Sequence, residues 1–390
     1  MITIEKLIPG GMGLGTADDG RKIFFWNALP GENILSYQIT KQKSHYSEAI
    51  AAEVENYSPH RVEPKDACFL ATSPWQILDF KYELEQKQQL VVELFREHDI
   101  KITTPEIITD HHEYFYRNKM EYSLYYNHAL ETIQLAFHVR GSHQKLPINS
   151  SSIERPEIFQ RATEIVDELN KNGDEARKYQ SLLLRCNQAG EVSGGLFEKK
   201  KPHPAFEPLT DVILGQTYSY SPNGFFQINP PVYELALAEI KKHITSADVL
   251  DLYAGVGTIG LSVARDKNLT LVEVDNSAFA ELINNSYNLS NVLSILSKSE
   301  EVLTHVREGQ TVILDPPRAG CDTKLIQKLL EIKPVKIIYL SCNPATQARD
   351  VKLLLEKYQI EEIKTFNFFP RTPHIENLVI LSPKSPLISL

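Results

Sequence analysis

Residues 249–260 read Val-Leu-Asp-Leu-Tyr-Ala-Gly-Val-Gly-Thr-Ile-Gly, an apolar run that leads into three closely spaced glycines. The apolar part predicts a buried strand over 249–253, and the glycines predict a sharp turn into a helix. Glycine lets the backbone bend and approach a ligand closely, and the helix amino terminus offers free N–H groups. This stretch therefore predicts the first strand, turn and helix of an α/β ligand-binding domain.

The sequence after residue 249 continues as an alternation of strand and helix. Strands are predicted at 249–253, 269–273, 292–295, 311–315, 335–340 and 377–381, and helices at 278–287, 324–330 and 345–358. Near-continuous apolar strands separated by helices are typical of a mainly parallel sheet that helices cover on both faces. We therefore expect a Rossmann-like α/β domain over residues 211–390.

Two further domains are expected before it. Residues 1–59 contain short alternating runs broken by glycines, which predicts a small β-barrel. Residues 60–210 mix helical spacing at 82–97 and 157–169 with alternating aromatic segments, which predicts a central α+β domain.

Composition excludes several classes of protein. The 390 residues carry a formal net charge of -9, which argues mildly against a surface that grips phosphate backbones everywhere. The sequence shows neither an amino-terminal leader nor an apolar run of membrane-spanning length, so a cytoplasmic protein is expected. The four cysteines lack any Cys-x-x-Cys pair, so we expect neither a disulfide framework nor a finger-type metal site.

Glu273 extends the glycine-rich stretch into a cofactor motif. It ends the second predicted strand, sixteen residues beyond Gly257, where a carboxylate can accept hydrogen bonds from ribose hydroxyls. A nicotinamide cofactor fits this pattern nearly as well as S-adenosylmethionine, and a purely structural turn is also compatible. The loop Asp315-Pro-Pro-Arg318 favours a methyltransferase, because methyltransferases that act on nucleobases use an acidic-Pro-Pro loop to grip the flipped base. Dehydrogenases have no need of such a loop. An arginine after the prolines, where amino-group methylation usually shows an aromatic residue, argues against an exocyclic amine as the target.

Cys342 is the candidate nucleophile. As a free cysteine it could simply be a small buried residue. It follows an apolar strand, however, and precedes a helix that Pro344 can start, and a thiol near a helix amino terminus is expected to be acidified. Addition of such a thiolate to carbon 6 of uracil makes carbon 5 nucleophilic. A base must then remove the carbon 5 proton, and Glu376 before the last strand can supply that carboxylate.

Together these motifs resemble the RNA (uracil-5-)methyltransferase family, whose members make 5-methyluridine in tRNA or large-subunit rRNA. The resemblance rests on residues 225–229, 251–257, 315–318, 341–344 and 374–376. Gly10-Gly-Met-Gly-Leu-Gly15 with Ala28-Leu-Pro-Gly-Glu32 is similar to the TRAM domain that many of these enzymes carry. The resemblance implies a monomeric RNA-binding enzyme that uses S-adenosylmethionine, with the central region as an RNA-binding domain.

Residue by residue, the resemblance implies Cys342 as nucleophile and Glu376 as proton acceptor. The implied cofactor-binding residues are Gln227, Tyr253, Gly255, Gly257, Thr258, Glu273 and Asp315. The implied or candidate RNA contacts are Gln227, Asp315, Arg318, Arg117 and Lys119. No metal is expected, and an iron–sulfur cluster, which many rRNA-modifying relatives hold, is not expected because Cys68 has no cysteine partners nearby. Asn367 stands where relatives often have Asp.

The sequence is also compatible with two other functions. RNA cytosine-5 methylation uses the same thiolate addition but needs a second cysteine, for which Cys321 is the candidate. A catalytically silent RNA-binding protein could also be built on this fold. The barrel is expected to contribute RNA affinity without taking part in catalysis.

Overall fold

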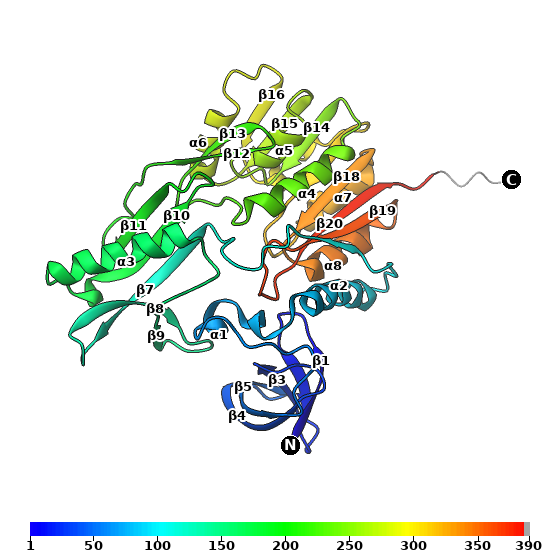
Figure 1. The fold of residues 1–390 in the computed structure, drawn as a ribbon. Helices are drawn as coiled ribbons and strands as arrows, with labels where there is room; N and C mark the ends of the chain where they lie inside the picture. Colours follow the sequence, from blue (N-terminus) through cyan, green and yellow to red (C-terminus); the bar gives the residue numbers. More distant parts are fainter. Residues whose placement is uncertain (386–390) are drawn as a thin grey trace.

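The computed structural model describes residues 1–385 and contains a barrel, a central sheet and a large mixed sheet (Figure 1). After the amino-terminal barrel, residues 80–108 contribute a helix and an edge strand to the large sheet; the chain then forms the central sheet and returns to complete the large sheet. Among the described residues, no helix is both long and apolar enough to cross a membrane.

The small β-barrel predicted at the amino terminus is confirmed. Its strands close in the order β1-β2-β3-β5-β4. They are β1 (Ile2–Leu7), β2 (Gly13–Thr16), β3 (Lys22–Trp26), β4 (Asn33–Gln42) and β5 (Tyr46–Glu55). The barrel has its own small core, and Leu7 and Leu29 reach beyond it into the core of the large sheet.

The central region is a five-stranded sheet packed on one long helix. Its strand order is β11-β10-β7-β8-β9. The elements are β7 (Lys119–Asn127), β8 (Thr132–His138), β9 (Lys145–Pro147), α3 (Pro156–Lys171), η2 (Ala176–Lys178), β10 (Tyr179–Cys186) and β11 (Val192–Glu198). A hairpin of β12 (Leu209–Ile213) and β13 (Gln216–Tyr220) follows.

The large sheet has eight strands in the order β16-β15-β14-β17-β18-β20-β19-β6. They are β6 (Glu106–Ile108), β14 (Asp248–Leu252), β15 (Asn268–Glu273), β16 (Val292–Leu296), β17 (Thr311–Leu314), β18 (Lys336–Ser341), β19 (Tyr358–Phe366) and β20 (Glu376–Pro383). β14 to β18 are parallel, whereas β20 runs antiparallel to both of its neighbours. The mainly parallel α/β sheet is therefore confirmed.

Helices cover both faces of this sheet. One face packs against α2 (Phe80–Glu97), α7 (Thr323–Ile332) and α8 (Pro344–Leu354), and the other against α4 (Pro230–Lys242), α5 (Thr258–Val263) and α6 (Asn276–Asn285). Leu250 lies in the first core and its neighbour Val249 in the second, because successive side chains of a strand point to opposite faces.

Two features differ from the sequence expectation. The helix expected to run to Tyr358 ends at Leu354, and Tyr358 instead begins the edge strand β19. The range 60–210, expected to form one domain, divides between two sheets: α2 packs on α8, and β6 pairs with β19. Short strands such as β6, with three residues, carry too little periodicity to be recognised.

Candidate active site

The glycine-rich turn between β14 and α5 is shaped to receive a ligand. Tyr253, Gly255 and Gly257 all have positive φ, at 68°, 57° and 87°. A non-glycine residue in this conformation is strained, and such strain gathers at functional sites. A Cβ added to Gly255 would meet nothing within 4 Å, so this part of the turn faces open space. Thr258, by contrast, is buried at the first position of α5.

Glu273 fixes the turn from the end of β15. One carboxylate oxygen accepts a hydrogen bond from the Gly255 N–H at 2.7 Å, and the other accepts from Val274 and Asp275 at 2.8 and 2.7 Å. A carboxylate oxygen has more than one lone pair, so these bonds leave acceptor capacity for hydroxyl groups of a ligand. The open turn and the oriented acid together fit the ribose end of an adenosine cofactor.

The loops after β17 and β18 meet at the next part of the sheet edge, as predicted. Asn343 Nδ2 and Thr346 Oγ1 both donate to the Arg318 carbonyl oxygen, at 2.9 and 3.1 Å. Arg318 and Cys342 line one cavity of about 200 Å³, together with His374. Pro9 and Gly10 of the barrel also line this cavity, which the sequence did not predict.

Cys342, Asp315 and Glu376 interact electrostatically in this region. Burial raises the pKa of the Cys342 thiol to about 11, and the carboxyl groups of Glu376 and Asp315 act in the same direction, opposed by Arg318. Burial likewise raises the pKa of Asp315 to about 7, and burial followed by Asp315 raises the pKa of Glu376 well above its ordinary value. This direction is opposite to the acidification expected from the start of helix α8, because burial of the thiol and the two nearby acids raise its pKa.

Arg318 reaches across the cavity to the last loop. Its Nη2 donates to Nδ1 of His374 at 3.2 Å. Burial and the neighbouring guanidinium lower the pKa of His374 below its ordinary value. The ring is therefore neutral at physiological pH, and its Nε2 carries the proton when Nδ1 accepts.

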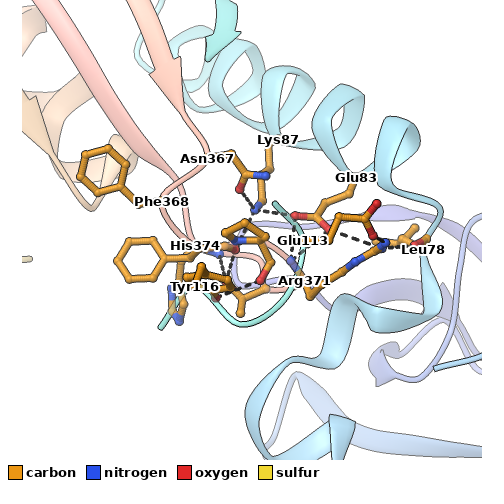
Figure 2. Close-up of polar contacts among 12 residues, drawn as sticks. Leu78, Glu83, Lys87, Glu113, Tyr116, Asn367, Phe368, Arg371 and His374 are labelled. Atoms are coloured by element: carbon orange, nitrogen blue, oxygen red, sulfur yellow. Dashed lines mark hydrogen bonds and ion pairs between the residues drawn. The ribbon is translucent and has the colours of Figure 1, made fainter. Parts of the chain in front are cut away.

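The loop between β19 and Glu376 is held by a buried ion pair on α2 (Figure 2). Lys87, which is fully buried, donates to Glu83 Oε1 at 2.8 Å, to Asn367 Oδ1 at 2.6 Å and to the Phe369 carbonyl oxygen at 3.0 Å. Glu83 accepts from the Arg371 N–H at 3.0 and 3.1 Å. We call Glu83, Lys87, Asn367 and Arg371 the loop anchor.

Two more contacts complete this support. Figure 2 also shows the Arg371 side chain, which pairs with Glu113, and Tyr116, whose hydroxyl donates to the Pro370 carbonyl oxygen at 3.0 Å. Sequence reasoning missed the loop anchor entirely. The only local signal was a Glu and a Lys four residues apart on a helix, and the exposed pair Lys81 and Glu85 on the same helix has that spacing too.

The loop that carries Gln227 is tied to the central sheet. Lys119 Nζ donates to the carbonyl oxygens of Asn223 and Gly224, both at 3.0 Å, and Arg185 Nη2 donates to that of Phe226 at 3.1 Å. Arg117 lies beside them, with its Nε bonded to the Lys119 carbonyl oxygen. In this structure Lys119 supports the loop from within the protein; burial lowers its pKa to about 8.

Cys321 and Cys68 are buried, and neither lines the cavity. Cys321 belongs to the core of the large sheet, and its N–H donates to Asp350 at 2.8 Å. Burial raises the pKa of both thiols to about 12.

Known proteins resemble this chain in both sequence and architecture. The family described as tRNA (uracil-5-)-methyltransferase matches residues 213–384. An uncharacterised RNA methyltransferase of Lactobacillus johnsonii is 30% identical, over 93% of this chain and 94% of its own length. One of Staphylococcus aureus is also 30% identical, over 93% of each chain, and one of Bacillus anthracis is 29% identical over 98% and 96%.

A solved structure has the same fold over the full length. The Pyrococcus abyssi tRNA (uracil-54, C5)-methyltransferase, solved with S-adenosyl-L-homocysteine, aligns with a TM-score of 0.77 and 24% identity. The alignment covers 98% of this chain and all of that one. The near full-length relatives and the family match show that the chain belongs to the RNA (uracil-5-)methyltransferase family.

Proposed function

We propose that this RNA methyltransferase forms 5-methyluridine in tRNA or large-subunit rRNA, with S-adenosylmethionine as the methyl donor. The observation that carries the proposal is the meeting of the loops after β17 and β18 at a cavity lined by Cys342 and Arg318, with the carboxyl groups of Glu376 and Asp315 close enough to raise the pKa of the Cys342 thiol. The Pyrococcus abyssi relative of the same fold binds S-adenosyl-L-homocysteine, and Gly255 and Glu273 fit the same type of ligand here.

Cys342 begins the proposed reaction. Its thiol loses a proton to solvent, the thiolate sulfur forms a bond to carbon 6 of the uracil, and the electron pair of the carbon 5–carbon 6 double bond moves toward oxygen 4. Arg318 is a cation at this cavity and stabilises the negative charge that develops on the base. S-adenosylmethionine, which Gly255 and Glu273 would hold, would supply the methyl group to carbon 5 and leave as S-adenosylhomocysteine.

Glu376 completes the proposed reaction. As a carboxylate it removes the carbon 5 proton, the electrons re-form the carbon 5–carbon 6 double bond, and the sulfur–carbon 6 bond breaks to release the Cys342 thiolate. A raised pKa makes the Glu376 carboxylate a stronger base than an exposed one, which suits it to a carbon acid. Asp315 and Gln227 are proposed to contact the base and the cofactor.

The remaining assignments belong to the same proposal. Tyr253, Gly257 and Thr258 complete the cofactor site around the glycine-rich turn. Arg117 is proposed to contact RNA, together with the central sheet, whereas Lys119 contributes through the loop before Gln227. The cytosine-5 alternative requires a second nucleophile in the cavity, and the burial of Cys321 in the core speaks against it.

The test compares the step at which the reaction stops when Cys342 or Glu376 is replaced. Unmodified tRNA and large-subunit rRNA transcripts are incubated with methyl-labelled S-adenosylmethionine, and 5-methyluridine is mapped in whichever RNA is labelled. Cys342→Ala is expected to give neither product nor covalent complex. Glu376→Gln is expected to transfer the methyl group and accumulate a labelled protein–RNA adduct that survives denaturing electrophoresis. An adduct that forms with Cys342→Ala but not with Cys321→Ala would favour RNA cytosine-5 methylation instead.

A further inference from the structure

The turn between β1 and β2 of the barrel touches the loop that leads to Glu376. Residues 8–12 form this turn, closed by hydrogen bonds from the Ile8 N–H to Met12 and from the Gly11 N–H to Ile8. Gly11 is buried, with φ at 91°. A Cβ added to it would lie 2.6 Å from Pro373 Cγ and 2.9 Å from Trp75 Nε1. Only a glycine fits between the barrel and this loop without displacing one of them.

Trp75 joins the two segments by hydrogen bonds. Its indole Nε1 donates to the Gly11 carbonyl oxygen at 2.9 Å, and its backbone N–H donates to the Arg371 carbonyl oxygen at 3.1 Å. The side chain is only 1% exposed, so it has little freedom to follow a displaced neighbour. The barrel turn is thus connected to the same loop that the loop anchor holds from the other side.

The barrel itself is fixed against the large sheet. Leu7, at the end of β1, packs in the same core as Trp75 and Ile375. Lys6 also pairs with Glu93 of α2 at 2.9 Å. Because Ile375 directly precedes Glu376, the packing runs from the barrel to the residue next to the proposed base. The turn also supplies Pro9 and Gly10 to the wall of the Cys342 cavity.

We propose that the β1–β2 turn is a positioning element of the reaction centre, with Gly11 and Trp75 as positioning residues that hold the loop before Glu376. This inference rests on the proposed role of Glu376 as the base. It revises the expectation that the barrel only adds RNA affinity. Displacing the turn should slow removal of the carbon 5 proton more than it weakens RNA binding, since a misplacement of about 1 Å can cost roughly 100-fold in rate.

The experiment compares Gly11→Ala with Gly20→Ala in the full-length protein. Gly20 lies in another turn of the same barrel, has φ at 83°, and a Cβ there would meet nothing within 4 Å. Both substitutions therefore carry a similar backbone strain, but only the first adds an atom against Pro373 and Trp75. Trp75→Phe, which removes the Nε1 donor without adding bulk, is the second variant and serves if Gly11→Ala does not fold.

The readout is the lifetime of the methylated protein–RNA adduct in a single turnover, measured beside the KM for RNA. Gly11→Ala and Trp75→Phe are expected to lengthen that lifetime about 10-fold or more, and Gly20→Ala to leave it within about 2-fold of wild type. If both test variants change only the KM, or match Gly20→Ala, the turn has no positioning role. If wild type itself forms neither 5-methyluridine nor an adduct, the proposed function fails first, and the two failures are thereby distinguished.

Discussion

Lys87→Met removes the cation of the loop anchor while keeping most of the side-chain volume. Lys87 and Glu83 are both fully buried, and removing one partner of a buried pair costs about 3–5 kcal/mol when the other charge is left alone. Glu83 also pairs with the Arg371 guanidinium, whose Nη1 lies 3.8 Å from Oε2, so part of its charge stays compensated. Glu83 keeps its two hydrogen bonds from the Arg371 N–H, so the lower end of that range applies. Lys87 also satisfies two acceptors of the loop, Asn367 Oδ1 and the Phe369 carbonyl oxygen, and both would lose a donor.

The loss should be local to the loop before Glu376. A cost of about 3 kcal/mol corresponds to roughly a 100-fold change in an opening equilibrium, because each 1.4 kcal/mol is a factor of ten. Hydrogen exchange of peptides that cover residues 366–376 should therefore speed up by about that factor. The reporter amides are those of Asn367 and Arg371, which donate to Ile108 and Glu83 in the folded protein.

The matched control lies on the same helix. Lys81 and Glu85 have the same residue types and spacing as the buried pair, but the Lys81 side chain is 88% exposed and the atoms are 4.0 Å apart. An exposed pair of this kind is worth about 0.3–0.5 kcal/mol, so Lys81→Met should change exchange by roughly 2-fold at most. Equal exchange in Lys87→Met and Lys81→Met would refute the reasoning, because it would mean that burial of the pair adds nothing to the loop.

Three further outcomes are expected. Asn367→Asp should raise thermal stability, by roughly 1 kcal/mol, since it gives Lys87 a second carboxylate and replaces a buried amide nitrogen that lacks a partner among the described residues; a lower melting temperature would contradict this. Because the pKa of the Cys342 thiol is raised to about 11, the thiolate fraction and kcat/KM for RNA should rise with pH between about 6 and 9, approaching tenfold per unit; a flat profile would contradict a raised pKa of this thiol in the free enzyme. Burial raises the pKa of Asp251 from 3.8 to about 8, so the folded state retains a proton that the unfolded chain has lost, and stability falls as pH rises through that window. Asp251→Asn should reduce the difference in melting temperature between pH 5 and pH 8, whereas an unchanged difference would place the cause elsewhere.

The cofactor prediction also has a direct measurement. Purified protein is expected to bind S-adenosylmethionine and to show neither visible absorbance nor stoichiometric iron. A cluster recovered from anaerobic preparations would overturn the inference from the isolated Cys68.

The sequence by itself determined the features that repeat or stand together along the chain. Alternating strands and helices predicted the parallel sheet, and the glycines after β14 predicted the turn at its edge. Loops that follow neighbouring parallel strands meet at one edge, so the sequence alone predicts that Arg318 and Cys342 lie close together. These signals are local, or follow from general rules of strand order.

Only the tertiary structure decided how the reaction centre is supported and charged. Lys87 contacts Asn367 across 280 positions, and Trp75 contacts Gly11 across 64, and no periodicity records such pairs. The pKa of Cys342 depended on how much water and which acids surround the thiol, and burial with Glu376 and Asp315 reversed the expectation drawn from the helix start. Desolvation and long-range contact are properties of the packed chain, so the sequence named the proposed reacting groups while packing set their ionisation and their support.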